Sequence, residues 1–458
     1  MASIRTFDSL RIRDYRLLWL GQVSTSMGQW MDQFTRAWLI YEITGSPFQL
    51  GAVTAARGLP LLLFGILAGA FADRSGRKMQ LIVAQVTNGG LNFILAVLVI
   101  TGHVQEWHVY VTAFLAGSVQ AFQQPARQTL ISDLVPENRL LNALALNSAA
   151  LNSSRTIGPA VAGLVIAGVG TGGSYMLQAI MYLFATLWTF QIVIPARVGA
   201  RDEDGQLRER LPFVRSVAEG LAFAAREPNI RAQLLLGLGP LTFAMSYTAL
   251  MPLIAINVLH GSATLGGTLL SSIGIGSLIG ALVVASMQRR TGYGLSVVLG
   301  AIAFAVSLFA FASSNVVWLS LALGTVLGLF NVTYTTQNQS LLQIMTPRPL
   351  RGRVMSIYLL NRGLAPVGAL VAGFLAEHFG GQDAMRGLSI IALVIVAVVV
   401  ATHTHILRLE VPLGDRHEDR GAERGAPGGR VGLTERAGRD PTTVADEDLA
   451  SLERRARA

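Results

Sequence analysis

The sequence predicts an all-α membrane protein with twelve transmembrane helices in two pseudo-symmetric six-helix bundles. Three observations support this class. The 458 residues are 52% hydrophobic and only 14% charged, whereas a soluble chain carries about 25% charged residues. About twelve apolar segments, most of them about 18 residues or longer and so able to cross a bilayer, follow one another along the chain. Motifs of the first half also return in the second half.

The apolar segments follow in order, separated by short polar connections. They are expected near 17–43, 48–72, 79–101, 107–126, 141–168, 174–194, 231–257, 264–287, 294–313, 316–338, 354–379 and 386–407. Most arginines, among them Arg127, lie in every second connection and in the segment before the first apolar run. Because arginine-rich loops stay in the cytoplasm, these connections and both termini are predicted on the inner side of the membrane.

The domain boundaries follow from these segments. They give a cytoplasmic N-terminal segment 1–16, an N-terminal bundle 17–194, a cytoplasmic linker 195–230, a C-terminal bundle 231–408 and a cytoplasmic tail 409–458. In the linker, apolar residues at helical spacing predict an amphipathic helix on the inner membrane surface. Its apolar face consists of Val214, Val217, Leu221 and Ala224. The tail is rich in Arg, Glu, Asp and Gly and poor in apolar residues, which predicts disorder.

The two halves of the chain repeat each other. The segment QTLISDLVPENR at 128–139 matches QSLLQIMTPRPL at 339–350, and RTIGPAVAG at 155–163 aligns with RGLAPVGALVAG at 362–373. Two halves in the same membrane orientation are related by an axis along the membrane normal. This is the parallel-repeat plan of transporters that rock one half against the other.

Two motifs carry a resemblance to a known family. The charged stretch GAFADRSGRKMQL at 69–81 resembles the loop motif between helices 2 and 3 of the major facilitator superfamily. Its matching residues are Gly69, Asp73, Arg74, Gly76, Arg77 and Lys78. The stretch GPAVAG at 158–163 resembles the antiporter motif of the family's drug exporters, although Ala162 replaces one of its glycines. Its candidate residues are Gly158, Pro159 and Gly163, together with the preceding Arg155. The opening SLRIRDYRLLWLGQVSTSMGQWM resembles the branch that holds the enterobactin exporter and macrolide-efflux transporters.

The resemblance implies that the 69–81 loop is a cytoplasmic gate. In the family, the carboxylate corresponding to Asp73 faces the N-terminus of helix 11 when the inner side is closed. A carboxylate is favoured at a helix N-terminus by about 0.3–1 kcal/mol, so this role is physically reasonable. The alternative is a loop whose arginines serve only to fix its cytoplasmic location. The resemblance also implies a monomer.

Charged residues inside the predicted spans indicate a functional site, because each costs at least ~2.5–3.5 kcal/mol at a helix centre unless paired or hydrated. Asp32 is the only acid deep within a span, and Arg36 follows it at i,i+4, within reach of an ion pair. Burial favours the neutral acid, whereas a nearby arginine favours the carboxylate. Asp32 and Arg36 are therefore candidates for proton coupling. The alternative is a static ion pair that stabilises the first helix.

Other polar side chains within the spans are candidates for lining a central cavity. They are Gln29, Gln33, Arg57, Gln123, Gln124, Asn152, Asn331, Gln337, Asn338, Asn361 and Arg362. Arg155 and Arg362 occupy equivalent positions in the two repeats, which indicates either an architectural role or contact with an anion or substrate. Any of the amides can instead form a hydrogen bond between helices.

Composition and motifs exclude several other classes of function. The chain has no cysteine, so it has neither disulfides nor thiolate metal sites, and it contains no phosphate-binding loop for ATP hydrolysis. Neither a metal nor an enzymatic activity is expected. The net charge of +9 is explained by inner-side loops, so nucleic acid is not expected as a partner.

These observations and the resemblance predict a secondary active transporter of the bacterial inner membrane. It is expected to export an amphipathic small molecule, a drug or siderophore, by alternating access and in exchange for protons. The proton motive force would be its energy source, with no cofactor, and its partners would be the substrate and the lipid bilayer. One alternative is a proton-coupled importer of a small solute. Another is a membrane sensor or scaffold that transports nothing.

Overall fold

The fold is helical throughout the part of the chain that the computed structural model describes. These residues are 7–72, 76–193, 222–223, 225–286, 292–347, 350–351, 354–355, 357–358 and 363–409. The predicted amphipathic helix of the linker lies almost entirely outside the described residues. The predicted disordered tail does too, apart from Leu409.

The first half contains a short helix, η1 (Asp8–Arg11), and five assigned α-helices. They are α1 (Arg13–Thr44), α2 (Pro47–Ala72), α3 (Arg77–Ile100), α4 (Glu106–Leu134) and α5 (Glu137–Phe190). The helix α5 covers two predicted spans, because Gly170 breaks it with a φ of 76°. A positive φ is accessible to glycine at little cost. Gly170 therefore marks the connection predicted between these two spans.

The second half begins with an irregular span from Pro228 to Val258. It consists of α7 (Pro228–Leu238), η2 (Gly239–Phe243), η3 (Ala244–Leu250), α8 (Met251–Leu253) and η4 (Ile254–Val258). Pro240 and Pro252 lie within this span. Proline has no backbone N–H and interrupts regular helical hydrogen bonding. The predicted span at 231–257 is therefore present, but as a succession of α, π and 3-10 turns.

The remaining described helices of the second half are regular. They are α9 (Ala263–Ser286), α10 (Tyr293–Ala312), α11 (Val317–Met345), α13 (Ala365–Phe379) and α14 (Gly381–Thr402), followed by η6 (Thr404–Arg408). Each overlaps a segment that the hydropathy predicts to be a span. The helix α13 covers the second part of the span predicted at 354–379.

Local sequence signals define several helix ends. The helix α1 ends at Gly45, whose φ of 64° is left-handed and whose N–H donates to the Tyr41 carbonyl. Pro47 then begins α2, a position where the missing N–H of proline costs nothing. The N-terminus of α4 is closed by a capping box between Gln105 and His108.

Seven helices among the described residues are long and apolar enough to cross a membrane. One is α5, whose 54 residues hold two predicted spans. The helices α1, α2 and α4 are also long, with 32, 26 and 29 residues. They contain charged side chains such as Asp32, Arg57 and Arg127. These three helices therefore combine the length of a span with the polarity of a functional site.

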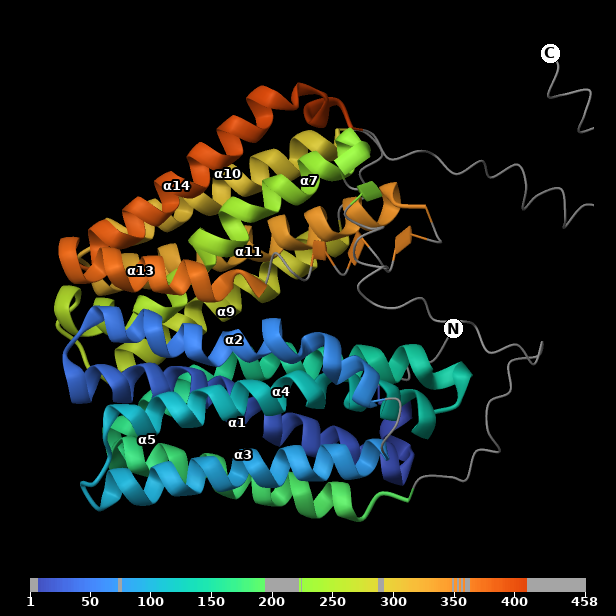
Figure 1. Ribbon diagram of the computed structural model, residues 1–458, viewed down its shortest axis with the longest axis vertical. Helices are drawn as coiled ribbons and strands as arrows, with labels where there is room; N and C mark the ends of the chain where they lie inside the picture. The colour runs from blue at the N-terminus through green and yellow to red at the C-terminus, as the bar shows by residue number, and fades with distance from the viewer. Residues whose placement is uncertain are drawn as a thin grey trace, which may run out of the picture. The chain divides into compact units, whose positions relative to one another are not determined.

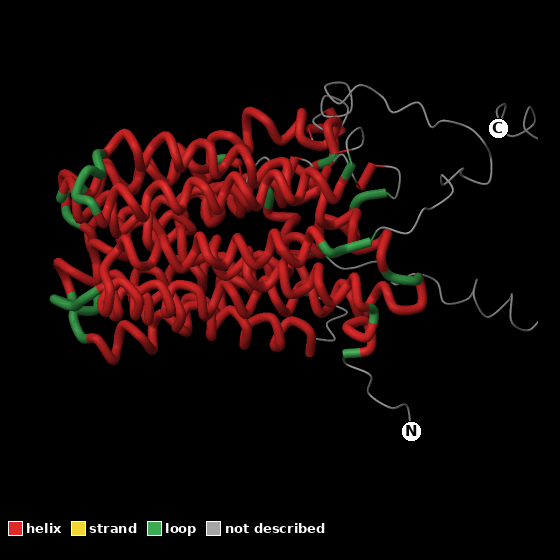
Figure 2. The backbone as a smooth tube through the Cα atoms, turned by 90° about the horizontal axis from the view of Figure 1, so that it is seen from below, coloured by secondary structure: helices red, strands yellow, loops and turns green. Residues whose placement is uncertain are grey.

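The helices form two groups that follow the two halves of the sequence (Figure 1). In the first group, α1 and α3 pack on α5, and α2 packs on α4. In the second, α9 packs on α11, and α10 packs on α11 and α14. The groups meet where α5 packs on α9 and where α2 packs on α13. Figure 2 shows the same helices running side by side from another direction.

Small residues bring the two groups into close contact. A Cβ added to Gly51 of α2 would overlap the Ala369 carbonyl oxygen of α13. One added to Gly267 of α9 would overlap the Pro159 carbonyl oxygen of α5. Glycine at such positions lets helix backbones approach closely within a membrane. The interface between the halves is thus a backbone contact.

Candidate functional site

The candidate site is a cavity between the two groups of helices. Its larger part has a volume of about 430 Å³ and is lined by α1, α2, α4 and the residues around the start of α13. A smaller part of about 100 Å³ is lined by α1, α5, η3 and α9. Trp30 and Gln33 of α1 line both parts. Both halves of the chain therefore contribute to the site.

Asp32 lies behind the larger cavity and is held by two arginines. Arg36 Nη2 donates to Asp32 Oδ1 at 2.8 Å, as the i,i+4 spacing predicts, and Arg57 Nη1 of α2 donates to Oδ2. The Asp32 and Arg36 side chains are only 5% and 3% exposed. Such burial is tolerated when a charge is paired and hydrogen-bonded. The pair predicted from sequence is thus a triad that joins α1 to α2.

Arg36 is fixed by further acceptors on α4. Its Nη1 donates to the Thr112 hydroxyl at 2.6 Å and to the Val109 carbonyl at 3.1 Å. Sequence reasoning missed both partners, since neither residue type nor spacing indicates them. Together with Arg57, these contacts make Arg36 and Asp32 the junction of α1, α2 and α4.

The other cavity candidates separate into two sets. Gln29, Gln33, Arg57 and Gln124 line the larger cavity, and Arg155 and Pro159 line the smaller one. Gln123, Asn152, Asn331, Gln337 and Asn338 line neither of these cavities. Of the second set, Asn331 donates to Met245 Sδ, Gln337 accepts from Ser296, and Asn152 donates to Ser148 in its own helix. Asn361 and Arg362 lie outside the described residues, next to the lining residue Gly363.

The described residues of the loop motif tie α3 to its neighbours. Arg77 Nη1 forms an ion pair with Asp133 near the end of α4. Lys78 Nζ donates to the carbonyls of Phe190 at 2.8 Å and Ile192 at 2.7 Å, at the end of α5. A cation is favoured at a helix C-terminus. Gly69 lies in α2 and Gly76 precedes α3, whereas Asp73 and Arg74 lie outside the described residues.

The residues of the antiporter-type motif lie where α5 meets α1 and α9. Gly158 faces Trp30, so an added Cβ would overlap that side chain, and Gly163 contacts the backbone of Ala263 in α9. The Arg155 guanidinium lies over the Trp30 ring, 5.5 Å from its centroid. The glycines therefore permit close helix packing, while Arg155 belongs to the cavity wall.

Two contacts join the halves at the end of the molecule opposite the loop motif. Glu377 near the end of α13 accepts hydrogen bonds from the Ser46 hydroxyl at 2.8 Å and the Phe48 N–H at 2.9 Å, at the start of α2. Asn257 Nδ2 donates to the Tyr41 hydroxyl at 2.9 Å. None of these residues belongs to a motif or to the polar positions predicted to line the cavity, although Glu377 is an isolated acid at the end of an apolar run.

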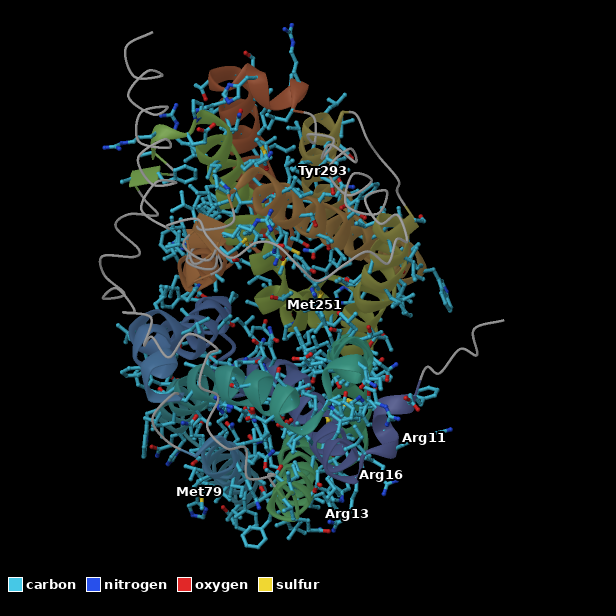
Figure 3. All side chains as sticks on the ribbon, turned by 90° about the vertical axis from the view of Figure 1, so that its right-hand side faces the viewer. Arg11, Arg13, Arg16, Met79, Met251 and Tyr293 are labelled. Carbon is cyan, nitrogen blue, oxygen red and sulfur yellow. The ribbon has the colours of Figure 1, made fainter. Side chains whose placement is uncertain are left out.

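Arginine side chains gather at the end that holds the start of α3. Arg11, Arg13 and Arg16 are exposed there. Figure 3 views the molecule from this end and labels these three arginines in the lower part of the picture, where Met79 of α3 also lies. Arg127, expected in a connection, is instead buried within α4 and donates to Gln22 and Thr25. The helix α4 continues past Arg127 to Leu134, and these polar side chains of α1 compensate the buried guanidinium.

Membrane-spanning helices in two groups, with a cavity between them that both halves line, define the protein as a multi-pass membrane transporter. Comparison with known proteins agrees. The chain matches the family described as transmembrane secretion effector over residues 4–422, and it belongs to this family of the major facilitator superfamily.

Relatives of established activity include several exporters. The chain is 26% identical to the staphyloferrin A transporter of Staphylococcus aureus, over 77% of this chain and 87% of that protein. It is 23% identical to macrolide efflux protein A of Streptococcus pyogenes, over 86% of this chain and 97% of that protein. It is 25% identical to the enterobactin exporter EntS of Citrobacter koseri, over 70% of this chain and 74% of that protein. The family and these relatives are transporters, which confirms the predicted branch and the prediction that the chain is not an enzyme.

Solved structures show the same fold. The nucleoside transporter NupG superposes with a TM-score of 0.69 at 12% identity, covering 85% of this chain and 99% of that one. A D-xylose–proton symporter superposes with a TM-score of 0.62 at 14% identity, covering 89% and 98%. The predicted major facilitator fold is therefore confirmed.

Proposed function

We propose that the protein exports an amphipathic small molecule of the drug or siderophore class across the bacterial inner membrane, in exchange for protons. The cavity between the two halves carries this proposal, because its wall contains residues from both halves and adjoins a buried ionisable triad. The efflux relatives support the outward direction. No cofactor is required, and the monomer is the working unit.

The exposed arginines orient the protein in the membrane. Arg11, Arg13 and Arg16 lie with the loop motif at one end, and positively charged segments stay in the cytoplasm. Both termini are then cytoplasmic, and Asp73 belongs to the inner gate. In this orientation, the Glu377 and Asn257 contacts join the two halves on the opposite, outer side.

The triad supplies a way to couple protons to this motion. Arg36 shares a helix with Asp32, whereas Arg57 comes from α2. A movement of α2 against α1 would remove one guanidinium from Asp32 and favour its protonation. Coupling requires that protons and substrate favour different conformations. Asp32 would then carry the proton, and Arg36 and Arg57 would respond to its charge.

The experiment uses inverted membrane vesicles energised to an acid interior and a fluorescent pH probe. Macrolides, dyes and catecholate siderophores are added one at a time to vesicles with and without the protein. We expect at least one compound to release protons only when the protein is present. Absence of release by every compound, together with uptake of labelled compound in the inward direction in whole cells, would contradict export.

A further inference from the structure

Basic side chains gather where the start of α7 lies beside η6, the turn that follows α14 (Figure 1). Arg231 of α7 donates from Nε to His403 Nε2 at 3.3 Å. Arg226, just before α7, and Arg408, at the end of η6, are exposed. Glu227 is one turn before Arg231, yet none of the three arginines forms an ion pair with an acid in the described part of the chain. The region therefore carries an excess of positive charge.

The Arg231 guanidinium is held in place and still has free donors. Its Nη1 donates to the Ala225 carbonyl at 3.2 Å, and its Nε donates to the His403 ring. The other ring nitrogen, Nδ1, lies 2.8 Å from the Thr402 hydroxyl, which fixes the ring. Arg231 Nη2 has no partner among the described residues, and the residue is exposed. The planar fork of donors is thus oriented and available to an anion.

An exposed apolar stripe of α14 leads to these basic residues. Ile390, Val394 and Val398 are 49%, 55% and 55% exposed, and Thr402 continues their spacing of four residues, which places all four on one face of the helix. The helix α14 is apolar and long enough to cross a membrane, and these residues line neither part of the cavity. The stripe is therefore a lipid-facing surface.

The length of the stripe matches one leaflet of a bilayer. From Ile390 to Thr402 the helix rises about 18 Å, at about 1.5 Å per residue. One leaflet contributes about 15 Å of hydrocarbon, half of the core of the bilayer. The stripe can therefore accompany an acyl chain through one leaflet, and Arg231 lies at the level of the phosphate of the same lipid.

We propose that this surface is a binding site for an anionic phospholipid. The phosphate accepts hydrogen bonds from Arg231, and one acyl chain lies along Ile390, Val394 and Val398. Basic residues at the surface of a helical bundle bind anionic head groups. A zwitterionic lipid is disfavoured, because its own cationic group adds to the positive charge of the site.

The site involves both ends of the second half. The helix α7 begins this half, and it packs on α14 and η6, which end it. A lipid that contacts Arg231 and the α14 stripe together holds the irregular first span of this half against its last helix. The inference depends neither on the transported molecule nor on the direction of transport.

The test measures lipid binding by native mass spectrometry of the purified protein in detergent. Phosphatidylglycerol and phosphatidylcholine with the same acyl chains are titrated separately. We expect the first phosphatidylglycerol to bind about tenfold more tightly than the first phosphatidylcholine, because the nearby arginines attract its uncompensated charge. Equal or tighter binding of phosphatidylcholine would overturn the proposal.

Variants test the position of the site. Arg231→Gln is expected to weaken phosphatidylglycerol binding about fivefold and to leave phosphatidylcholine unchanged. Arg231→Lys keeps the charge and is expected to retain most of the affinity. The matched control is Arg16→Gln, because Arg16 is an exposed arginine near the start of α1, away from α7 and α14. Unchanged phosphatidylglycerol binding by Arg231→Gln, or an equal loss by Arg16→Gln, would reject the site.

A soluble head group distinguishes a lipid from free phosphate. Glycerol 3-phosphate carries the phosphate but no acyl chain, so it cannot use the stripe of Ile390, Val394 and Val398. We expect it to leave phosphatidylglycerol bound at equal concentration. Displacement at equal concentration would show that the phosphate alone is sufficient, and would reject a lipid as the occupant.

Discussion

Asp32 joins α1 to α2, and the proposed proton coupling depends on the same contacts. Its two oxygens accept from Arg36 and Arg57, and Arg36 is held in turn by Thr112 and Val109. Removal of one member of a buried ion pair leaves an uncompensated charge, which is worse than removal of both. The triad is therefore stable only as a unit, and any step that separates it must compensate the charge.

A double-mutant cycle tests this dependence. We expect Asp32→Asn and Arg36→Gln each to destabilise the protein by about 3 kcal/mol. The double variant should lose less than the sum, by about 1–3 kcal/mol, because it leaves only Arg57 without its carboxylate, whereas Asp32→Asn leaves both arginines without one. The measurement is thermal unfolding of the purified proteins in one detergent. Additive losses would show that the two residues do not interact.

The sequence predicts only part of this site. The i,i+4 spacing indicates the Asp32–Arg36 pair because both residues lie on one helix. Arg57 could not be assigned in the same way, since its position depends on how α2 packs against α1. Arg155 was singled out from its motif, but its contact with Trp30 follows from tertiary packing.

At the scale of elements, a hydrogen-bonded contact joins the start of α2 to the end of α13. Glu377 accepts from the Ser46 hydroxyl and from the Phe48 N–H in the first turn of α2. A carboxylate at this position satisfies a free backbone donor and interacts favourably with the helix dipole. The bond is exposed, so it is weak enough to break during a transport cycle.

The Glu377→Ala variant tests this contact. We expect the variant to lower the stability of the state closed at this end by about 1 kcal/mol relative to the open state. This corresponds to a roughly fivefold increase in the population that is open at this end. Since the chain has no cysteine, spin labels can be placed at His103→Cys and Asn315→Cys, and their distance measured by double electron–electron resonance. The control is Asp383→Ala at the start of α14, an exposed acid that pairs with Arg386. Equal distance distributions for both variants would contradict a role for Glu377.

The glycine contact between α2 and α13 gives a second prediction. Gly51→Ala places a Cβ against the Ala369 carbonyl, and neither backbone can give way easily. We expect the halves to separate at this end and transport to fall at least ~10-fold, while the protein still folds. Gly90→Ala in α3 is the matched control, because a Cβ there meets open space. Full transport by Gly51→Ala would show that close packing is not needed.

The sequence predicted most elements because hydropathy and length determine spans in a membrane. Gly170 illustrates a connection correctly placed by the run GVGTGG. The π and 3-10 turns between Gly239 and Val258 were not predicted. The periodicity of an entirely apolar segment does not distinguish these turns from a regular helix, even though Pro240 and Pro252 indicate where it is interrupted.

For the whole molecule, the repeat of the two halves is the property on which the proposed transport motion depends. The cavity lies between the halves and is lined by residues of both, and the Glu377 bond spans them. Rocking of one half against the other would break the contacts at one end and form new ones at the loop motif. In the proposed orientation, the end that holds the arginines near the start of α3 faces the cytoplasm.

Transport by Asp32→Asn in proteoliposomes distinguishes proton coupling through Asp32 from a static ion pair. The measurement compares proton-driven movement of a substrate identified in the vesicle assay with exchange of labelled for unlabelled substrate. Asp32→Asn is expected to lose proton-driven transport at least ~100-fold and to keep exchange, since exchange requires no change of protonation. Proton-driven transport at the wild-type rate by Asp32→Asn would contradict proton coupling through Asp32.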